Sequence, residues 1–393
     1  MTRSQGGAER AVAEGSRPLA RLPILGGIQE RAARLATSRY VPAVTLLILL
    51  KIAVSGLGTI PREPYRLAAL DPFHRVTAHP ENYFQRSPLL PLLGYFSGLT
   101  SPSGFGALCL TIVTIGLMAY ALMARRRHGA QDGLLQFGLV VSHPVTLVLL
   151  SWLGTPDGLS FLFATVLLFS NSLPLIGLAS ALGAFNHPVI HFVAPVVIIL
   201  RLAAREPGLK NRSLGAVALG LLLGNAAVLA FLDAFGIETF SRLDFLMDRS
   251  LLTWVKQNTF ALPHTLYSLH QASWFALALC VGVLFNRDRR YYLMFAASQL
   301  LFFVVTFFSA DTTRVFSLLA WAPALHCIQH SLSLVDQTEG AASREVFRQV
   351  LILVAIVGLL TPGYYIWTGE LHLPNFNGFY NPILGGLLRL IGR

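Results

Sequence analysis

The sequence has few charged residues and few cysteines. Only 12% of its 393 residues are charged, against roughly a quarter in ordinary soluble domains, while 54% are hydrophobic. One soluble core cannot bury this much apolar surface, so we expect lipid to be the solvent. The three cysteines, Cys109, Cys280 and Cys327, lie inside apolar segments. We therefore infer neither a disulfide framework nor a metal site.

The sequence also has no contiguous basic face, although its formal net charge is +11. The Arg and Lys residues stand at the ends of apolar runs, which indicates topology signals and not a nucleic-acid site. Residues 1–39 hold seven arginines without an apolar core, so they do not form a cleavable signal peptide. We interpret 1–39 as a basic cytoplasmic tail and 40–393 as a single transmembrane domain. High Ala and Arg content favours a bacterial inner membrane.

What the sequence does contain is a series of apolar runs near the roughly 20-residue length of a transmembrane helix. The positive-inside rule orients them with the N-terminus in the cytoplasm and the C-terminus outside. Proline and asparagine break the stretch 159–200 into short pieces, which we count as three crossings, or as one crossing with a re-entrant pair. The fold class predicted is an all-α polytopic protein of about eleven spans. The predicted crossings are 40–57, 104–123, 136–153, three within 159–200, 213–235, 272–285, 291–309, 315–330 and 350–368.

This topology places most of the polar connections on one side of the membrane. Two long external loops, 60–87 and 236–270, share that side with the short turns at 154–158 and 311–314. The cytoplasmic connections are mostly short and arginine-rich. We therefore expect the chemistry on the non-cytoplasmic face.

The first external loop carries a candidate general base. Asp71 lies in Leu70-Asp71-Pro72-Phe73-His74-Arg75, where a carboxylate near an imidazole and an arginine can take a proton from a hydroxyl. The alternative is a loop aspartate that caps a short helix.

This loop resembles the first-loop pattern of the GT-C glycosyltransferases: an acidic residue, then an aromatic, then the run 86–91, Arg-Ser-Pro-Leu-Leu-Pro, which opens a helix. These polytopic enzymes include mannosyltransferases that use polyprenyl-phosphate sugars. The resemblance covers mainly residues 40–200, including the short broken helices. It implies Asp71 as the catalytic residue and a lipid-linked sugar donor. GT-C members often carry paired acidic residues here, whereas Asp71 precedes Pro72, so no divalent cation or other cofactor is supported.

Further candidate residues lie on the same predicted face. Asp157 is either a second carboxylate that orients the acceptor or an Asp-Gly turn residue. Asp311 and Arg314 are three apart and either pair with each other or, through Arg314, bind the donor's phosphate. The predicted substrate-binding set is His74, Arg75, Asp157, His264, His270, Asp311 and Arg314.

Three other ionisable residues are unusual for their positions. His187 and His191 have a metal-ligand spacing, but backbone hydrogen bonding is the commoner use of such histidines. Lys51 lies inside the first apolar run, where an ionisable side chain usually faces a cavity or a partner. The alternative is that its ammonium group snorkels to a membrane interface, although Lys51 lies near the middle of the run.

We therefore expect a membrane glycosyltransferase that moves a sugar from a polyprenyl-phosphate carrier to a lipid or glycan hydroxyl by inverting displacement. Two alternatives stay open. A transporter or flippase of lipid-linked sugars would place charged residues at the midplane of several helices. A polymerase or O-antigen-ligase-like protein would depend most on the loop at 236–270.

Overall fold

A computed structural model describes residues 39–58, 63–78, 82–240, 251–260, 262–307, 309, 311–367 and 369–372. These residues are mainly α-helical, with one short antiparallel hairpin in which Tyr365 pairs with His372. The elements in chain order are α3 (Tyr40–Ser55), α4 (Glu63–Leu70), the 3₁₀ helix η1 (Tyr83–Arg86), α5 (Leu89–Ser97), α6 (Pro102–Ser142), α7 (Pro144–Ser151), α8 (Asp157–Phe169), α9 (Leu173–Asn186), α10 (Ile190–Ala203), α11 (Arg212–Ala234), α13 (Leu251–Phe260), α14 (Leu262–His270), α15 (Ser273–Arg287), α16 (Arg289–Phe307), α17 (Thr312–Leu360), β1 (Tyr365–Trp367) and β2 (Glu370–His372).

Several helices have the length and apolar character of membrane spans. Among the described residues, α6, α11 and α16 are each long and apolar enough to cross a bilayer. Helices α14 and α15 together form a fourth candidate, bent by 74°. Four shorter apolar helices, α3, α8, α9 and α10, accompany them. These features are compatible with a membrane protein, and the total of about eleven crossings stays a prediction.

The stretch 159–200 folds into three short helices that reverse direction twice. Asn186, at the end of α9, donates to the carbonyl of Pro156 at 2.9 Å, just before α8. Arg201, near the end of α10, donates to the carbonyls of Leu167 and Ser170 at 2.6 and 2.7 Å, at the other end of α8. Helices α8, α9 and α10 have 13, 14 and 14 residues, which is about 20 Å each at 1.5 Å per residue. We call the two ends of this bundle the Asp157 end and the Glu206 end.

Glycines interrupt the two longest helices, α6 and α17. Gly129 and Gly340 have φ values of +80° and +81°, in the left-handed region that glycine tolerates best. Beyond these breaks, the carboxylate of Asp132 in α6 forms ion pairs with Arg344 and Arg348 of α17, at 2.8 and 3.0 Å. The pairs hold the two bent helices together next to their breaks.

The C-terminal part of the chain differs from the expected pattern. The polar segment 331–348 is helical within α17, apart from the break at Gly340. The predicted last span, 350–368, ends as a helix at Leu360, because Pro362 follows and cannot continue it. The β1–β2 hairpin comes next. The predicted external C-terminus and the basic tail 1–38 lie outside the described residues.

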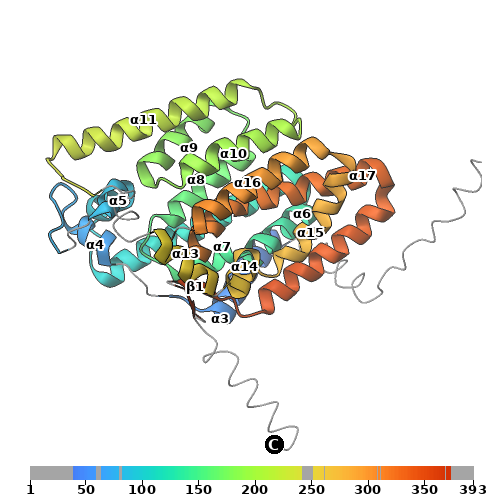
Figure 1. Cartoon of the computed structure of the whole chain (residues 1–393), viewed down its shortest axis with the longest axis horizontal. Helices are drawn as coiled ribbons and strands as arrows, with labels where there is room; N and C mark the ends of the chain where they lie inside the picture. The colour runs from blue at the N-terminus through green and yellow to red at the C-terminus, as the bar shows by residue number, and fades with distance from the viewer. Residues whose placement is uncertain are drawn as a thin grey trace, which may run out of the picture.

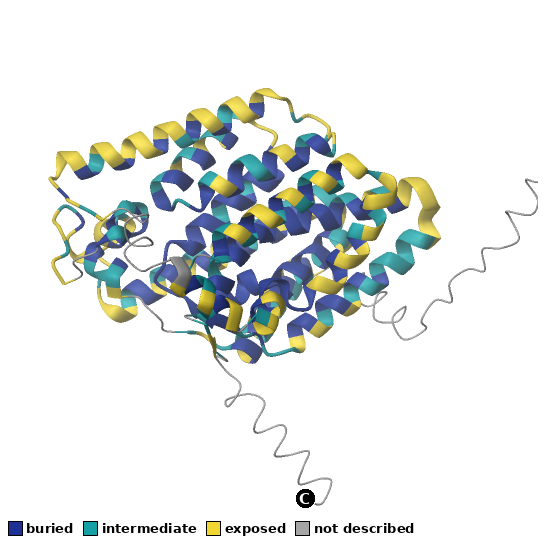
Figure 2. Cartoon of the chain, in the orientation of Figure 1, coloured by how far each residue is buried: buried dark blue, intermediate teal, exposed yellow. Residues whose placement is uncertain are grey.

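Helix α11 forms one outer side of the molecule and is largely exposed (Figures 1 and 2). Its exposed side chains include Leu219, Leu222, Leu223 and Leu229. Its buried side is glycine-rich: a Cβ on Gly224 would lie 2.3 Å from the carbonyl oxygen of Ala181 in α9. Close approach through small residues is a common way for apolar helices to pack in a membrane.

Replacing Gly224 by Ala is expected to lower the unfolding temperature in detergent, because the backbone carbonyl of Ala181 cannot move aside as a side chain can. Overpacking of this kind costs about 1–3 kcal/mol. Gly215 is a matched control on the same helix, since a Cβ there would meet nothing within 4 Å. Gly215→Ala is expected to be neutral or slightly stabilising. Equal melting temperatures for the two variants would contradict this account of the α9–α11 contact.

A buried ionic cluster closes the Glu206 end. The Glu206 carboxylate lies 2.6 Å from Arg127 Nη2 of α6 and 2.7 Å from Arg201 Nε of α10. Its other oxygen lies 3.0 Å from His326 Nε2 of α17, and His326 Nδ1 lies 2.6 Å from the hydroxyl of Tyr291 in α16. One carboxylate therefore connects four helices at this end.

Acid is expected to weaken this cluster over a defined pH range. Burial raises the pKa of Glu206, but the hydrogen bond and charge of His326 and the charges of Arg201 and Arg127 outweigh it and lower the pKa from 4.5 to about 2. A lowered carboxyl pKa stabilises the fold above the unfolded value, and this contribution is lost as the pH falls from about 4.5 toward 2. Melting temperatures measured across this range should fall less steeply for Glu206→Gln than for the wild type. Parallel curves would contradict the assignment.

Candidate functional site

Parts of the two predicted external loops lie together in the structure. Asn82 donates to the carbonyl of Glu238 at 2.7 Å, and Arg86 donates to the hydroxyl of Thr239 at 2.9 Å. The ring of Phe73 lies 4.8 Å from that of Phe235 at the end of α11. Residues 79–81 and 241–250, including Glu81, lie outside the described residues. The first loop is thus fixed to the start of the second.

This loop assembly lies at the Asp157 end of the bundle. Helices α9 and α11 run in the same direction, because Gly177 is close to Ala216 and Gly224 is close to Ala181 and Ala184. The ends of both helices therefore lie at one end of the molecule, where Asn186 contacts Pro156. Figure 1 shows α4 and α5 beside that end of α11. The side of the membrane on which this end lies stays a prediction.

Asp71 and His74 form an exposed pair just after α4. Asp71 Oδ2 lies 2.7 Å from His74 Nδ1, and Asp71 Oδ1 accepts a hydrogen bond from the backbone N–H of Phe73 at 3.2 Å. Their side chains are 54% and 80% exposed, so both groups are open to a substrate. Arg75 lies 3.5 Å from the carboxylate of Glu238. The carboxylate orients the imidazole, and the pair can accept a proton.

Arg314 binds two carboxylates. Its Nε and Nη2 donate to the two oxygens of Asp157 at 2.7 and 3.0 Å, and its Nη1 donates to Asp311 at 3.0 Å. Its guanidinium lies 4.8 Å from the ring of Trp152. The local Asp311–Arg314 pair is the one that the spacing indicated. The bidentate partner, Asp157 at the start of α8, is 1% exposed.

These contacts change the roles expected for Asp157 and Arg314. Asp157 is buried against Arg314, whereas Asp71 is exposed in the loop. The two carboxylates therefore share an end of the bundle but have different environments. Three of the five guanidinium N–H groups of Arg314 already bind carboxylates. Phosphate binding by Arg314 stays a prediction, and it would require competition with both aspartates.

The segment 236–270 was expected to be a polar loop, but it contains helices α13 and α14. Asn258 fixes α13: it donates to the carbonyls of Phe307 and Ser309 at 2.8 and 3.2 Å and accepts from the hydroxyl of Thr312 at 2.6 Å. This junction immediately precedes Arg314. Asn258 was not singled out from the sequence, because an isolated asparagine gives no signal of a partner about fifty positions away.

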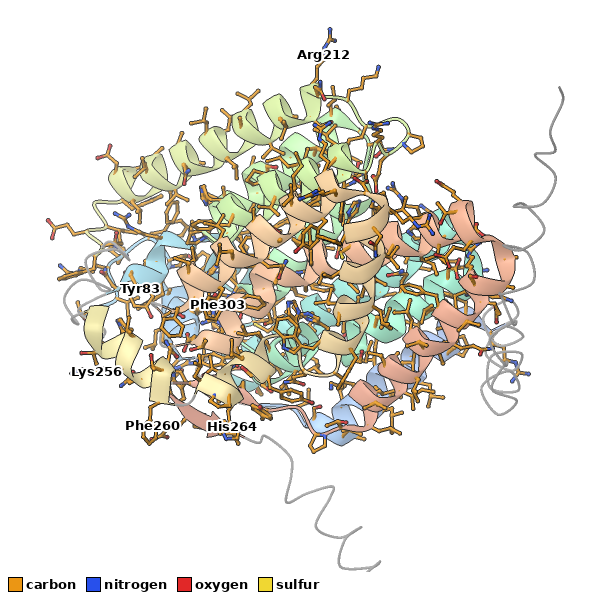
Figure 3. The ribbon with its side chains drawn as sticks, turned by 45° about the vertical axis from the view of Figure 1, so that its right-hand side comes forward. Tyr83, Arg212, Lys256, Phe260, His264 and Phe303 are labelled. Carbon is orange, nitrogen blue, oxygen red and sulfur yellow. The ribbon has the colours of Figure 1, made fainter. Side chains whose placement is uncertain are left out.

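The two histidines of this segment have different surroundings. His264 is exposed, and its carbonyl accepts a hydrogen bond from the hydroxyl of Tyr364 at 3.1 Å. In Figure 3, His264 lies on the same side of the molecule as Lys256 and Phe260, while Arg212 projects from another side. His270 is 0% exposed. Its expected position in an external loop is wrong, because the bend between α14 and α15 turns it into the bundle.

His270 belongs to a buried chain of hydrogen bonds. His143 Nδ1 accepts from the backbone N–H of Val145 at 3.1 Å, so its proton lies on Nε2. That Nε2 is 3.2 Å from His270 Nδ1, and His270 Nε2 is 3.2 Å from the side-chain oxygen of Gln299. His143 was missed in the sequence. The sequence feature that could have identified it is the His143-Pro144 pair inside a long apolar run, because a proline there indicates a helix break.

No group of three or more His, Cys, Asp or Glu side chains positioned to hold a metal is found in the described part of the chain. His187 Nδ1 accepts from the N–H of Val189 at 3.2 Å, and His191 Nδ1 lies 3.0 Å from the carbonyl oxygen of Pro188. Both therefore make the backbone hydrogen bonds that are the commoner use of such histidines.

An apolar cavity of about 260 Å³ lies between α10 and α16. Its lining, which includes Leu200 and Met294, contains none of the predicted site residues.

Comparison of the sequence with models of known protein families and with curated proteins gives no match.

Proposed function

We propose that this chain is an integral membrane glycosyltransferase, with Asp71 as the general base. The observation that supports this best is the exposed Asp71–His74 pair, 2.7 Å apart, on a loop fixed to the end of α11. A solvent-open carboxylate with an oriented imidazole beside a bundle of apolar helices suits a hydroxyl acceptor and a lipid-linked donor. The resemblance of this loop to the GT-C pattern names the donor class, a polyprenyl-phosphate sugar.

The proposed reaction is a single displacement. The acceptor oxygen attacks the anomeric carbon, the bond from that carbon to the phosphate oxygen breaks, and polyprenyl phosphate leaves with the electron pair. The acceptor's proton passes to Asp71. His74 holds the carboxylate in position, and Arg75, 42% exposed, offers its cation to the phosphate from the same loop. His264 is exposed and available for a contact with the substrate.

The test is a transfer assay with the purified chain in phosphatidylcholine nanodiscs. Polyprenyl-phosphate mannose and polyprenyl-phosphate glucose would be offered with a polyprenyl-linked glycan acceptor. Mass spectrometry should detect polyprenyl monophosphate and an acceptor enlarged by one hexose, in equal amounts. Absence of both products with every donor, from protein that is folded by thermal unfolding, would overturn the proposal.

A second function, transport of lipid-linked sugars, is favoured by one observation. Lys51, His143 and His270 are each buried within the helical bundle, where a transporter would carry its ionisable groups. Protein in liposomes would be offered a fluorescent polyprenyl-phosphate sugar, and access of an outside reagent to the probe would be followed. Movement of the intact lipid without release of polyprenyl phosphate would favour transport over transfer.

A further inference from the structure

Three helix ends meet inside the bundle: the end of α6, the start of α15 and the end of α17, whose last residue is Leu360. Helix α6 ends at Ser142 before the break at His143, and α15 begins one residue after Ala272. A Cβ on Gly358 of α17 would lie 2.8 Å from the Ser142 Cβ and 3.2 Å from the Ala272 Cβ. Broken helices are tolerated at membrane depth where they face protein or line a cavity and not where they face lipid.

Lys51 of α3 points its ammonium group into this junction. Its Nζ lies 3.5 Å from the carbonyl oxygen of Gly358, at the long limit of a hydrogen bond. The side chain is 0% exposed. Within the described ranges, no ion pair includes Lys51. An ammonium has three N–H donors, and one weak contact leaves most of that capacity unused.

Among the described residues, the one atom within hydrogen-bond reach of the Lys51 ammonium is a carbonyl oxygen, and no carboxylate pairs with it. Within the part of the chain that the structure describes, the buried Ser55 hydroxyl, one turn further along α3, has no hydrogen-bond partner. The imidazole nitrogens of His143 are both occupied, by Val145 and by His270. An unpaired buried charge is very costly, and such charges in proteins are normally paired. An anion that accepts several hydrogen bonds would neutralise the Lys51 ammonium and use its N–H donors.

We propose that Lys51, with Ser55, is a binding site for a phosphate-type oxyanion inside the bundle. A phosphate group has several acceptor oxygens and suits the three donors of an ammonium, which binds it as a point charge. The oxyanion would replace the 3.5 Å contact with Gly358, the only hydrogen bond that the Lys51 side chain makes within the described residues. This site is separate from the exposed Asp71–His74 pair and does not depend on the proposed transfer reaction.

An experiment can distinguish two sources of the phosphate group, a lipid headgroup and a free anion. Wild-type protein in phosphatidylcholine nanodiscs would be titrated by calorimetry with inorganic phosphate and, separately, with dodecyl phosphate. Binding of dodecyl phosphate alone would identify a lipid headgroup as the ligand, and binding of inorganic phosphate would identify a free anion. Either result supports the site if it depends on Lys51. Failure of both probes to bind the wild type would overturn the proposal.

Lys51→Met keeps most of the length of the side chain and removes its charge. The expected loss of affinity is about 10- to 100-fold, the size of a hydrogen bond to a charged group. Lys51→Arg should retain most of the binding. Lys256 is exposed on α13 (Figure 3), so Lys256→Met is the matched control and should bind as the wild type does.

A structural role for Lys51 predicts a different result. If the ammonium serves ligand binding, removing a buried charge should leave the unfolding temperature of the unliganded protein unchanged or raise it. A Lys51→Met protein that melts at a clearly lower temperature, or that binds phosphate as tightly as the wild type, would overturn the proposal.

Discussion

Replacing Asp71 by Asn is expected to lower the rate of sugar transfer by about 10²–10⁴-fold, the contribution of general-base catalysis. The amide keeps the size of the carboxylate, and its oxygen can still accept the hydrogen bond from the Phe73 N–H. It cannot take a proton from the acceptor hydroxyl at neutral pH. Because the Asp71 side chain is 54% exposed, the variant should fold and melt as the wild type does.

The control for this variant is Asp233→Asn, an exposed carboxylate near the end of α11, at the same end of the molecule. It removes the same charge without touching the Asp71–His74 pair and should retain the transfer rate. Donor binding should also survive in Asp71→Asn, because an aspartate opposes an anionic donor electrostatically. A folded Asp71→Asn protein with near-normal transfer would rule out Asp71 as the base and place transport first.

Charge and hydrophobic length predicted that several polar connections share one face of the membrane. The turns at Asp157 and Asp311 and the first external loop were placed together from the arginines that flank alternate apolar runs. The structure brings Asp157 and Asp311 onto one guanidinium. The side predicted for each connection depends only on whether the number of crossings before it is odd or even. Errors in the predicted helix boundaries therefore do not change it.

Long-range partners could not be predicted in the same way. The Asp311–Arg314 pair is three residues apart and is visible as a helical spacing, whereas Asp157 lies 157 positions from Arg314. The burial of His270 was also missed. Helices α13 and α14 have 10 and 9 residues, shorter than the roughly 20 that mark a span. Polar residues within them made the segment look like a loop, and only the bend before α15 determines where His270 points.

The buried pair of Arg314 and Asp157 allows a second large effect to be predicted. Asp157→Ala is expected to destabilise the protein by about 3–5 kcal/mol, because it leaves a buried guanidinium without its bidentate partner. Asp311 is 23% exposed and contacts Arg314 through one oxygen. Asp311→Ala is therefore the matched control and is expected to cost about 1 kcal/mol or less.

A double-mutant cycle separates the pair from its surroundings. Arg314→Met removes the guanidinium that Asp157→Ala leaves uncompensated, so the double variant should be more stable than the sum of the two single losses allows. The coupling is expected to be about 1–3 kcal/mol, at the upper part of the range for contacting residues. Thermal unfolding in detergent measures all four proteins. If the two losses simply add, the contacts at 2.7 and 3.0 Å contribute no net coupling. Arg314 would then be held by its other neighbours. Its guanidinium would be free to leave Asp157, and this result would favour the predicted phosphate-binding role of Arg314.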